Sequence, residues 1–537
     1  MFGATATDDK LGAESDDHTG YAMTDRSLPP LPPHSTALST AAGAAASGAA
    51  APDAAAASGL DTLPPAPRPA PTVPETPAPG ITTAAPATDV ALDSGPRWQP
   101  QPLAAALIGT LVAEALKRLP FAQDLQKRLR DDTATRLIDW VDHIVVPAGG
   151  DLTERLGNSG FVHRPRRGGT AAFVHPGARL PPVIIGPDAV MRLALKVEFV
   201  ADFCAVHGIS APIEGQPMAP YRRVLAATGD RAELWVVERR GYDGFQVADI
   251  DPRYPLDCLR ALEKFRARRR RWNDDADGFD HVEELVANAV IAVGTDMACA
   301  LFFAAEREYW QRRNRAARWQ KDRQDALGMG WANHDHHTYR SSRKQFRRLV
   351  EILEALGLAC RERFHPGANA GWGAQVLEQP VTGIVVFADV DMDAAEITQD
   401  FAHLGLEGTG PLRTVGLWCA LHGEAFLDAG MHHLECTFDH TALTTQLEAA
   451  GLRTMQPFTD LPYLRQSFTA GERWPVRRDR VLKLLAAEHI DPRQARIFLD
   501  EGVIGSHLEN LERNDGYKGF NQRGIDDIIS RTDPRRA

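Results

Sequence analysis

The chain has 537 residues, a formal net charge of −11 and a pI near 5.9, which allow two or three domains and argue against a general nucleic-acid binder. Its six cysteines form no C-x-x-C pair, which excludes a zinc finger and a disulfide framework and is typical of a reducing compartment. The N-terminus lacks the apolar core of a secretory signal, and no apolar run is long enough to cross a bilayer. We therefore expect a cytoplasmic protein without a membrane span.

The first two segments of the chain differ in composition. Residues 1–97 are rich in Ala, Pro, Thr and Gly and have almost no large apolar side chain, so they cannot bury enough surface to offset the entropy of ordering. We predict a disordered extension without a site of its own. Residues 98–160 are predicted to be helical, because leucines such as Leu107 and Leu111 recur at close to helical spacing. Residues 133–146 are expected to form the second helix of this segment.

Residues 161–330 are predicted to form an α+β unit followed by long helices. The unit consists of a strand, a helix and a strand, at 193–197, 200–207 and 231–238. The long helices are expected at 254–271 and 279–324, and both carry crowded arginines. Such helices can contact nucleic acid, but acidic neighbours such as Glu306 and Glu308 favour solvated faces with internal ion pairs. We therefore expect no nucleic-acid partner.

Residues 331–480 show the same pattern twice. The first copy is a strand, a helix and three strands, at 336–341, 343–356, 359–364, 372–378 and 383–390. The second is a strand, a helix and a further strand, at 433–438, 440–450 and 463–468. With the copy near residue 190, the chain is predicted to hold three diverged βαβββ-like units in an α+β fold. Residues 481–537 are predicted to form a helical C-terminal tail.

Polar and titratable residues gather on the first strand of each of the last two units. Because side chains alternate along a strand, one face is expected to carry His336, Thr338 and Arg340, and the other Asp335, His337 and Tyr339. In the second unit, one face carries His433, Glu435 and Thr437. An imidazole with a guanidinium further along the same face suits a bound metal whose anionic substrate is held by the arginine. We predict that the two strands are the halves of one metal site, with Thr338 and Arg340 on the substrate side.

A set of two histidines and one carboxylate is what non-haem iron oxygenases need. His336, His433 and Glu435 supply such a set, and Glu378 and Glu472 are rivals for the carboxylate. The neighbouring imidazoles are expected to be flanking residues or outer donors at most, and they are His334, His337 and His432. The alternative for each ligand is structural, such as a polar strand edge or an ion pair.

The stretch Asp335-His336-His337-Thr338-Tyr339-Arg340 resembles the first-strand motif of the 2-oxoadipate dioxygenase/decarboxylase (hydroxyglutarate synthase) family, within the vicinal oxygen chelate superfamily. His432-His433-Leu434 resembles the family's second-strand Asn-His-Leu. The resemblance implies paired βαβββ units that form a half-open barrel around one divalent metal. It also implies His336 and His433 as iron(II) ligands, and Arg340 as the residue that binds the substrate carboxylate.

The third ligand of that family is a glutamate on the last barrel strand, in a Gly-Glu-x-Glu-Gln-Arg-Gly setting. The most similar stretch of this chain, residues 519–524, contains no glutamate. Gly471-Glu472 is a second partial match to the motif. The carboxylate ligand therefore stays open among Glu435, Glu378 and Glu472.

The expected function is that of an iron(II)-dependent dioxygenase/decarboxylase that converts a 2-oxo acid resembling 2-oxoadipate, with dioxygen, into a hydroxy acid. Another divalent metal is an alternative to iron, and ring cleavage or glyoxalase-type isomerisation are alternative reactions on the same fold. A non-catalytic binding protein without a full ligand set is the alternative from another class. The sequence does not indicate an oligomeric state.

Overall fold

The structure, a computed structural model, describes residues 98–366, 370–408, 410–521, 525, 529 and 533–536. The chain divides into Met1–Pro86 and Ala87–Ala537, and every described residue belongs to the second part. The predicted disordered extension, residues 1–97, lies outside the described residues. None of the described helices has both the length and the apolar character that a bilayer crossing needs.

Two helices, α1 (Pro102–Arg118) and α2 (Pro120–Thr133), open the described chain. The helix expected at 133–146 is wrong, because Ala134 adopts a left-handed conformation with a φ of 52° that ends α2. A short 3-10 turn, η1 (Leu137–Trp140), follows. The β-branched run Ile144-Val145-Val146 then lies in a strand, which is what branched side chains favour.

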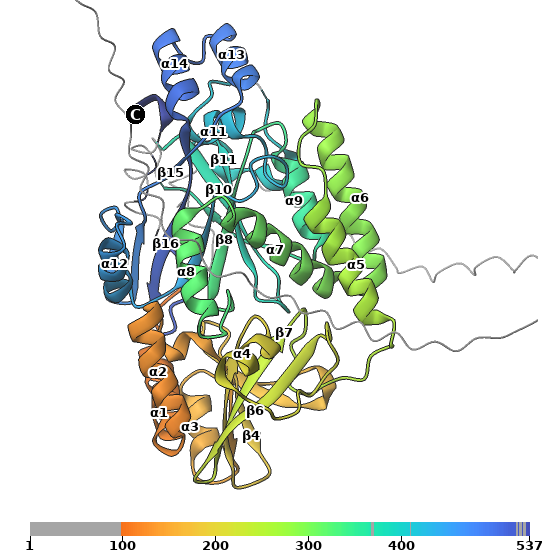
Figure 1. Cartoon of the computed structure of the whole chain (residues 1–537), viewed down its shortest axis with the longest axis vertical. Coiled ribbons are helices and arrows are strands. Elements are labelled where there is room, and N and C mark those ends of the chain that lie inside the picture. The colour runs from red at the N-terminus through yellow and green to blue at the C-terminus, as the bar shows by residue number, and fades with distance from the viewer. Residues whose placement is uncertain are drawn as a thin grey trace, which may run out of the picture. The chain divides into compact units, whose positions relative to one another are not determined.

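A seven-stranded sheet, the N-terminal sheet, has the order β2-β3-β4-β1-β5-β7-β6. Figure 1 labels its strands β4, β6 and β7. Its strands are β1 (Val141–Pro147), β2 (Val162–Pro165), β3 (Ala171–Val174), β4 (Val183–Gly186), β5 (Met191–Lys196), β6 (Tyr221–Gly229) and β7 (Ala232–Arg239). Among them lie α3 (Leu152–Asn158), η2 (Arg167–Gly169) and α4 (Val200–His207). They form a βαβββ unit, β1-α3-β2-β3-β4, and a shorter unit, β5-α4-β6-β7, whose first strands β1 and β5 pair antiparallel. The sequence predicted only the second of these units.

Four helices connect the two sheets, namely α5 (Tyr254–Ala267), α6 (Asp275–Val293), α7 (Thr295–Gln311) and α8 (Arg315–Asp325). The single helix expected at 279–324 is broken twice, at Gly294, which has a φ of 81°, and at Asn314, whose side chain caps α8. Arginines of α5 and of the following loop pair with Glu306 and Glu308, as the sequence predicts, but the pair of Arg268 with Glu306 is fully buried, so the expected solvated face is wrong there.

The nine-stranded C-terminal sheet has the order β13-β14-β16-β12-β8-β11-β10-β9, and β15 pairs with β16 beside it. Its first unit is β8 (His334–Ser341), α9 (Phe346–Ala355), β9 (Ala359–Phe364), β10 (Trp372–Glu378) and β11 (Val385–Asp391). Its second unit is β12 (His433–Thr437), α12 (His440–Ala449), β13 (Thr459–Leu461), β14 (Leu464–Phe468) and β16 (Val503–Arg513). β8 and β12 pair antiparallel, and the last strand of each unit runs parallel to the first. The predicted α+β fold with paired βαβββ units in a half-open barrel is confirmed.

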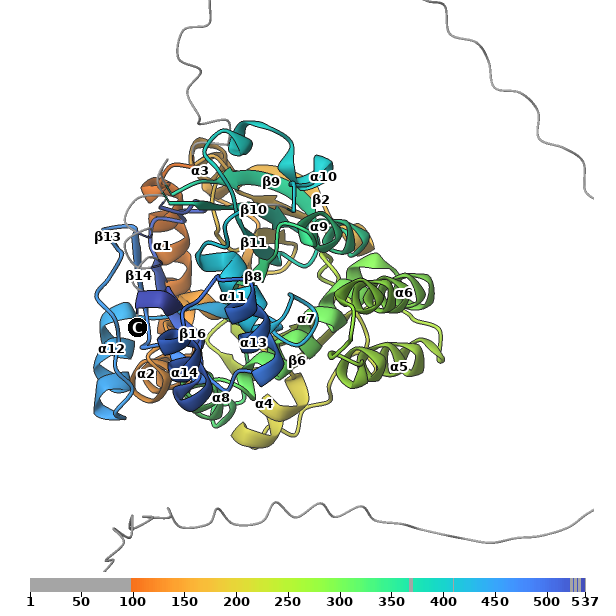
Figure 2. The ribbon, with the colours of Figure 1, turned by 90° about the horizontal axis from the view of Figure 1, so that it is seen from above.

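Further segments extend these units without changing their order. Between the units lie η3 (Glu396–Thr398), α10 (Phe401–Leu404) and α11 (Thr414–His422). Between β14 and β16 lie β15 (Glu472–Trp474), α13 (Arg478–Ala486) and α14 (Pro492–Glu501), and η4 (Pro534–Arg536) comes last. Seen from above, α5 and α6 lie on one side of β8, and α12 with β13 lies on the other (Figure 2).

The helical tail predicted for residues 481–537 is wrong in its middle. α13 and α14 are helices, but Val503–Arg513 is the strand β16, which lies between β14 and β12. Leu508 and Leu511 are spaced as on one face of a helix. In the fold, both faces of β16 are covered and nearly every residue of the strand is buried. Its sequence therefore shows no alternation of apolar and polar residues.

Candidate metal centre

Three central strands of the C-terminal sheet place four ionisable side chains at one point. The antiparallel pairing of β8 with β12 sets Glu435 opposite His336, and His433 opposite Thr338. The parallel pairing of β12 with β16 sets Glu509 opposite Glu435. Neighbours in register point to the same face of a sheet, so these side chains converge in its interior.

The Glu435 carboxylate lies at the middle of this group. Its Oε1 atom is 3.2 Å from His336 Nε2, accepts a hydrogen bond of 2.9 Å from Thr338 Oγ1, and also contacts His433 Nε2. Glu509 Oε2 is 4.0 Å from the same nitrogen of His433. His336, Glu435 and Glu509 each offer a ligand atom within 4.8 Å of the others, and all four residues are buried.

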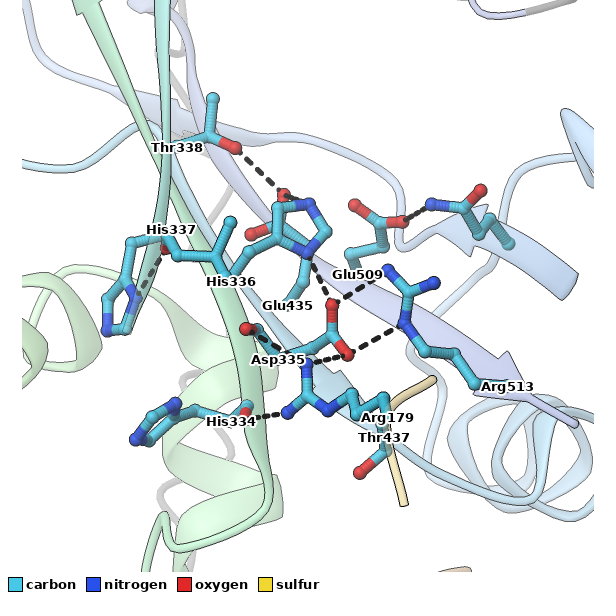
Figure 3. A network of polar contacts seen from close by, with 12 residues as sticks. Arg179, His334, Asp335, His336, His337, Thr338, Glu435, Thr437, Glu509 and Arg513 are labelled. Carbon is cyan, nitrogen blue, oxygen red and sulfur yellow. Dashed lines mark hydrogen bonds and ion pairs between the residues drawn. The ribbon is translucent and has the colours of Figure 1, made fainter. Parts of the chain in front are cut away.

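His336 is oriented by a carboxylate behind it (Figure 3). Asp335 Oδ1 lies 2.9 Å from His336 Nδ1, which leaves Nε2 to face Glu435. Arg513 donates two hydrogen bonds to Asp335, of 2.8 and 3.0 Å, and Arg179 donates a third, of 2.5 Å. Burial opposes ionisation of Asp335, but the two guanidinium groups prevail and hold its pKa well below the ordinary value. A carboxylate behind an imidazole in this way is common around bound metals.

Asp335 does not lie where strict alternation predicts it. Alternation along the strand puts it on the face opposite His336, yet its carboxylate contacts the His336 ring. The ladder between β8 and β12 is irregular between Glu435 and Cys436, where an extra residue of β8 is accommodated. This bulge re-aims one side chain and makes Asp335 a partner of the site.

The electrostatics of the group match a divalent cation. Burial, together with the nearby Glu509, raises the pKa of Glu435 well above its usual range, and burial raises the pKa of Glu509 to about 7. Burial lowers the pKa of His336 to about 4, so its imidazole is neutral and keeps a lone pair. Oε2 of Glu435 has no hydrogen-bond partner among the described residues. A divalent metal fits this donor set of two crowded carboxyl groups and two neutral imidazoles.

The structure separates the two rival carboxylates from this group. Glu378 lies at the end of β10 and pairs with Arg361 and Lys518, at 3.2 and 3.0 Å. Glu472 accepts hydrogen bonds from the backbone N–H groups at the start of α8. Both carboxylates therefore have other partners, and neither belongs with His336 and His433.

The flanking histidines also have their places. His334 and His337 lie on the other side of β8 from His336 (Figure 3). His432 bonds through Nδ1 to the carbonyl of Gly505, at 3.0 Å, and its Nε2 has no partner among the described residues. His507, opposite His433 in register, has no hydrogen-bond partner at either ring nitrogen in the part of the chain that the structure describes.

Glu509 is the residue that sequence reasoning missed, because β16 was expected to be helical. A repeat in the sequence carried the missing signal. Glu238-Arg239-Arg240-Gly241-Tyr242-Asp243-Gly244-Phe245 returns as Glu512-Arg513-Asn514-Asp515-Gly516-Tyr517-Lys518-Gly519-Phe520. The first copy follows a predicted strand, so the second copy indicates that a strand also ends near residue 513.

A cavity of about 40 Å³ adjoins the four side chains and has aromatic walls. The rings come from Phe364, Trp372, Phe387, Phe458, Phe468 and Phe520. Arg340 lines it and, among the described residues, forms no hydrogen bond or ion pair, and its exposure is 3%. Asp389 is opposite Arg340 in register, and burial raises the pKa of that carboxyl to about 7 although Arg340 opposes the shift. The cavity therefore holds a buried cation that forms no ion pair with any residue the structure describes.

Comparison with known proteins gives weak likenesses only. A scan against protein-family models and a search of curated proteins find no match. A triple mutant of 4-hydroxymandelate synthase from Streptomyces coelicolor is 12% identical, with 74% of this chain and 100% of that chain covered and a TM-score of 0.26. Methylmalonyl-CoA epimerase from Mycobacterium tuberculosis is 13% identical, with 34% and 89% covered and a TM-score of 0.20. A Mn(II)-bound glyoxalase from Novosphingobium aromaticivorans is 8% identical, with 70% and 82% covered and a TM-score of 0.17.

With TM-scores this low, these structures are not used to assign the fold or the function of this chain. The assignment of its fold rests on the order and pairing of its own strands, which are those of a vicinal-oxygen-chelate-like half-open barrel.

Proposed function

We propose that the protein is an iron(II)-dependent dioxygenase/decarboxylase that converts a 2-oxo acid into a hydroxy acid, with His336, His433 and Glu509 as metal ligands. The observation that supports it is that two buried neutral imidazoles, from β8 and β12, meet at the Glu435 carboxylate, with Glu509 of β16 4.0 Å from His433 Nε2. Two histidines and one carboxylate leave coordination positions open, and iron(II) bound in this way activates dioxygen toward a chelating 2-oxo acid.

Glu509 is preferred to Glu435 as the third ligand. Glu509 lies on the last strand of the barrel, where the resembled family carries its glutamate ligand. Gln466 donates a hydrogen bond of 2.7 Å to Glu509 Oε1, which turns Oε2 toward His433. Glu435 is the ligand expected from the sequence, and its Oε1 contacts the Nε2 atoms of His336 and His433. Glu435 then becomes a second carboxylate beside the metal.

Arg340 is proposed to hold the distal carboxylate of the substrate. A guanidinium that is buried without a carboxylate partner gains a charge-assisted pair when an anion enters. It stands four residues after His336 on β8, so the substrate spans from the metal to this cation along one face of the strand. The aromatic walls exclude water from the space between, and Thr338 lies on the same face.

A glyoxalase-type isomerase is the second candidate, and Glu435 is the observation that favours it. A carboxyl with a raised pKa and one oxygen without a partner is suited to take a proton from a carbon next to a carbonyl. The binding-protein alternative rests on an incomplete ligand set, and Glu509 as the proposed third ligand argues against it.

One assay separates these functions. The full chain is loaded anaerobically with Fe(II) and mixed with 2-oxoadipate and air. Dioxygen uptake and carbon dioxide release are both measured. The dioxygenase predicts that both occur in equal amounts with 2-oxoadipate and that Glu509→Gln abolishes them. Turnover of a hemithioacetal of methylglyoxal and glutathione without dioxygen uptake indicates the isomerase instead. Metal binding with no turnover of either substrate contradicts both enzymes.

A further inference from the structure

A second polar cavity lies on the other side of β8 from the metal centre. It has a volume of about 110 Å³ and is lined by Lys196 of β5, Arg307 of α7 and His334 of β8, among others. Lys196 and His334 also line a larger neighbouring cavity of about 540 Å³. The side chain of His334 points away from His336 (Figure 3), so this space is separate from the proposed metal site.

Two cations in this cavity lack a carboxylate partner. Among the described residues, Lys196 Nζ forms no hydrogen bond or ion pair. Arg307 is 9% exposed, and within the described part of the chain its Nε has no partner and its Nη1 contacts His337 Nε2, at 3.2 Å. Nδ1 of His334 is likewise buried without a partner. Buried polar groups of a folded protein are normally satisfied, so the unpaired atoms of Arg307 and His334, beside the half-buried Lys196, need an explanation.

The carboxylates around the cavity are already engaged. Asp142 attracts Lys196, but it accepts hydrogen bonds of 2.6 and 2.8 Å from Arg239 and contacts His143. Asp335 is shared by Arg179 and Arg513. Glu198 lies 3.3 Å from Lys321 and accepts from a backbone N–H of Trp331. Each acidic group thus has its own cation, and the charges of Lys196 and Arg307 remain in excess.

The excess of positive charge affects Lys196 directly. Burial lowers the pKa of its ammonium to about 8, and Arg239, Arg307 and Arg179 add to this effect. Leaving a buried cation unpaired is costly, whereas an oxyanion accepts several hydrogen bonds at once from ammonium and guanidinium donors.

We propose that this cavity is an oxyanion site, in which Lys196 and Arg307 together bind one carboxylate or phosphate group of a small ligand. The bound group connects β5 of the N-terminal sheet with α7, beside β8 of the C-terminal sheet. The proposal does not depend on the function assigned to the metal centre.

Thermal unfolding of the full chain in a buffer without oxyanions tests the site, with inorganic phosphate and succinate added in separate titrations. We expect at least one of them to raise the Tm saturably, by several degrees, which is about what a ligand far above its Kd does for a domain. A response to phosphate alone assigns a phosphate group, and a response to succinate assigns a carboxylate.

The variants make this test specific. Lys196→Met keeps the length of the side chain and removes the charge, so it should abolish the shift and should raise the Tm measured without ligand. Arg307→Met should abolish the shift as well. Lys264→Met, at an exposed position of α5, and Arg340→Met, in the metal-site cavity, should both keep it. The proposal is overturned if neither anion shifts the wild type, or if Arg340→Met rather than Lys196→Met removes the response.

Discussion

The N-terminal and C-terminal sheets contain the same buried network of an aspartate, a histidine and an arginine, but the residues around the network differ. In the N-terminal sheet, Asp142 contacts His143 Nδ1 at 2.6 Å and is held by Arg239 at 2.6 and 2.8 Å. In the C-terminal sheet, Asp335 contacts His336 and Arg513 in the same way. In each copy the arginine is the final residue of the last strand of its sheet and lies over a phenylalanine further on, at 4.9 and 4.8 Å.

The ladders of the two sheets correspond residue by residue. His143 is opposite Ala194, which is opposite Trp235, whereas His336 is opposite Glu435, which is opposite Glu509. Two residues earlier, the positions of His433 and His507 are taken by Arg192 and Glu233, which form an ion pair of 2.8 Å. The N-terminal sheet therefore keeps the Asp–His–Arg network without the surrounding ligands.

This difference separates architecture from chemistry. The network ties the first strand of a half-open barrel to the segment that follows its last strand, and it does so whether or not a metal can bind. The proposed ability to bind metal depends on His433 and on the two glutamates. His143 is thus a matched internal control for His336.

Removal of the proposed metal ligands should produce the largest difference between the two sheets. His336→Ala, His433→Ala or Glu509→Gln should each lower iron(II) affinity by more than the roughly 100-fold that loss of an outer partner costs. The fold should survive, because its apolar core is elsewhere. His143→Ala should leave the affinity unchanged. Metal content by elemental analysis, with circular dichroism, measures both, and equal affinity in all four variants contradicts the assigned site.

The two aspartates should differ in the same sense, with a smaller effect. Asp335→Asn removes the charge that orients His336, so iron(II) affinity should fall by roughly 10- to 100-fold. Asp142→Asn removes the equivalent charge in the N-terminal sheet and should lower only the stability. Competition with a chelator gives the affinities. If Asp142→Asn weakens metal binding as much as Asp335→Asn, the network acts through the fold.

Arg340 has no counterpart in the N-terminal sheet, where the register places Pro147. Arg340→Lys keeps the charge but loses the planar fork that matches a carboxylate. The KM for a dicarboxylic 2-oxo acid should rise by roughly 10-fold or more, in line with the loss of a charged hydrogen bond. Metal content should stay constant. A parallel loss of metal would show that Arg340 supports the fold of the site.

The smallest expected effect is a pH dependence that belongs to the C-terminal sheet. The pKa of Glu509 and that of Asp389 are each raised to about 7, so the metal-free folded state holds these protons more tightly than the unfolded chain. The stability that these groups contribute is present at low pH and is lost as the pH rises through 7. Buried histidines, whose pKa values are lowered, oppose this only below their ordinary value of 6.5.

Between pH 6.5 and 8, the unfolding free energy of the metal-free protein should therefore fall by on the order of 1 kcal/mol for each carboxyl. Urea denaturation at the two pH values measures it. Glu509→Gln should flatten the slope, and Asp389→Asn should flatten it further. Identical slopes in the wild type and both variants would contradict the assignment.

The strands and helices that could be located from the sequence alone are those whose pattern depends on residues near one another in the chain. The strand expected at 336–341 and the helix after it are β8 and α9, because apolar spacing marks the helix and Gly357, with a φ of 82°, follows it. That His336 and His433 lie near each other on two paired strands was likewise predictable, because each stands at the start of a unit of the same pattern.

The parts that sequence missed depend on tertiary context. β2, β3 and β4 have four residues each, too few for a period to appear. β16 is buried on both faces, so it has no alternation, and its leucines imitate a helix. Glu509 was lost with that strand. The bulge that brings Asp335 to His336 arises from the pairing of two strands and leaves no mark in either one.

The position of β16 has a consequence for how the protein is made. β16 lies between β12 and β14 in the sheet but follows both in the chain, with α13 and α14 synthesised before it. Until β16 leaves the ribosome, β12 and β14 each present an unpaired edge, which is a template for association with other chains. Chains that terminate before Val503 are therefore expected to aggregate, and the last ligand of the proposed centre arrives with the strand that closes the sheet.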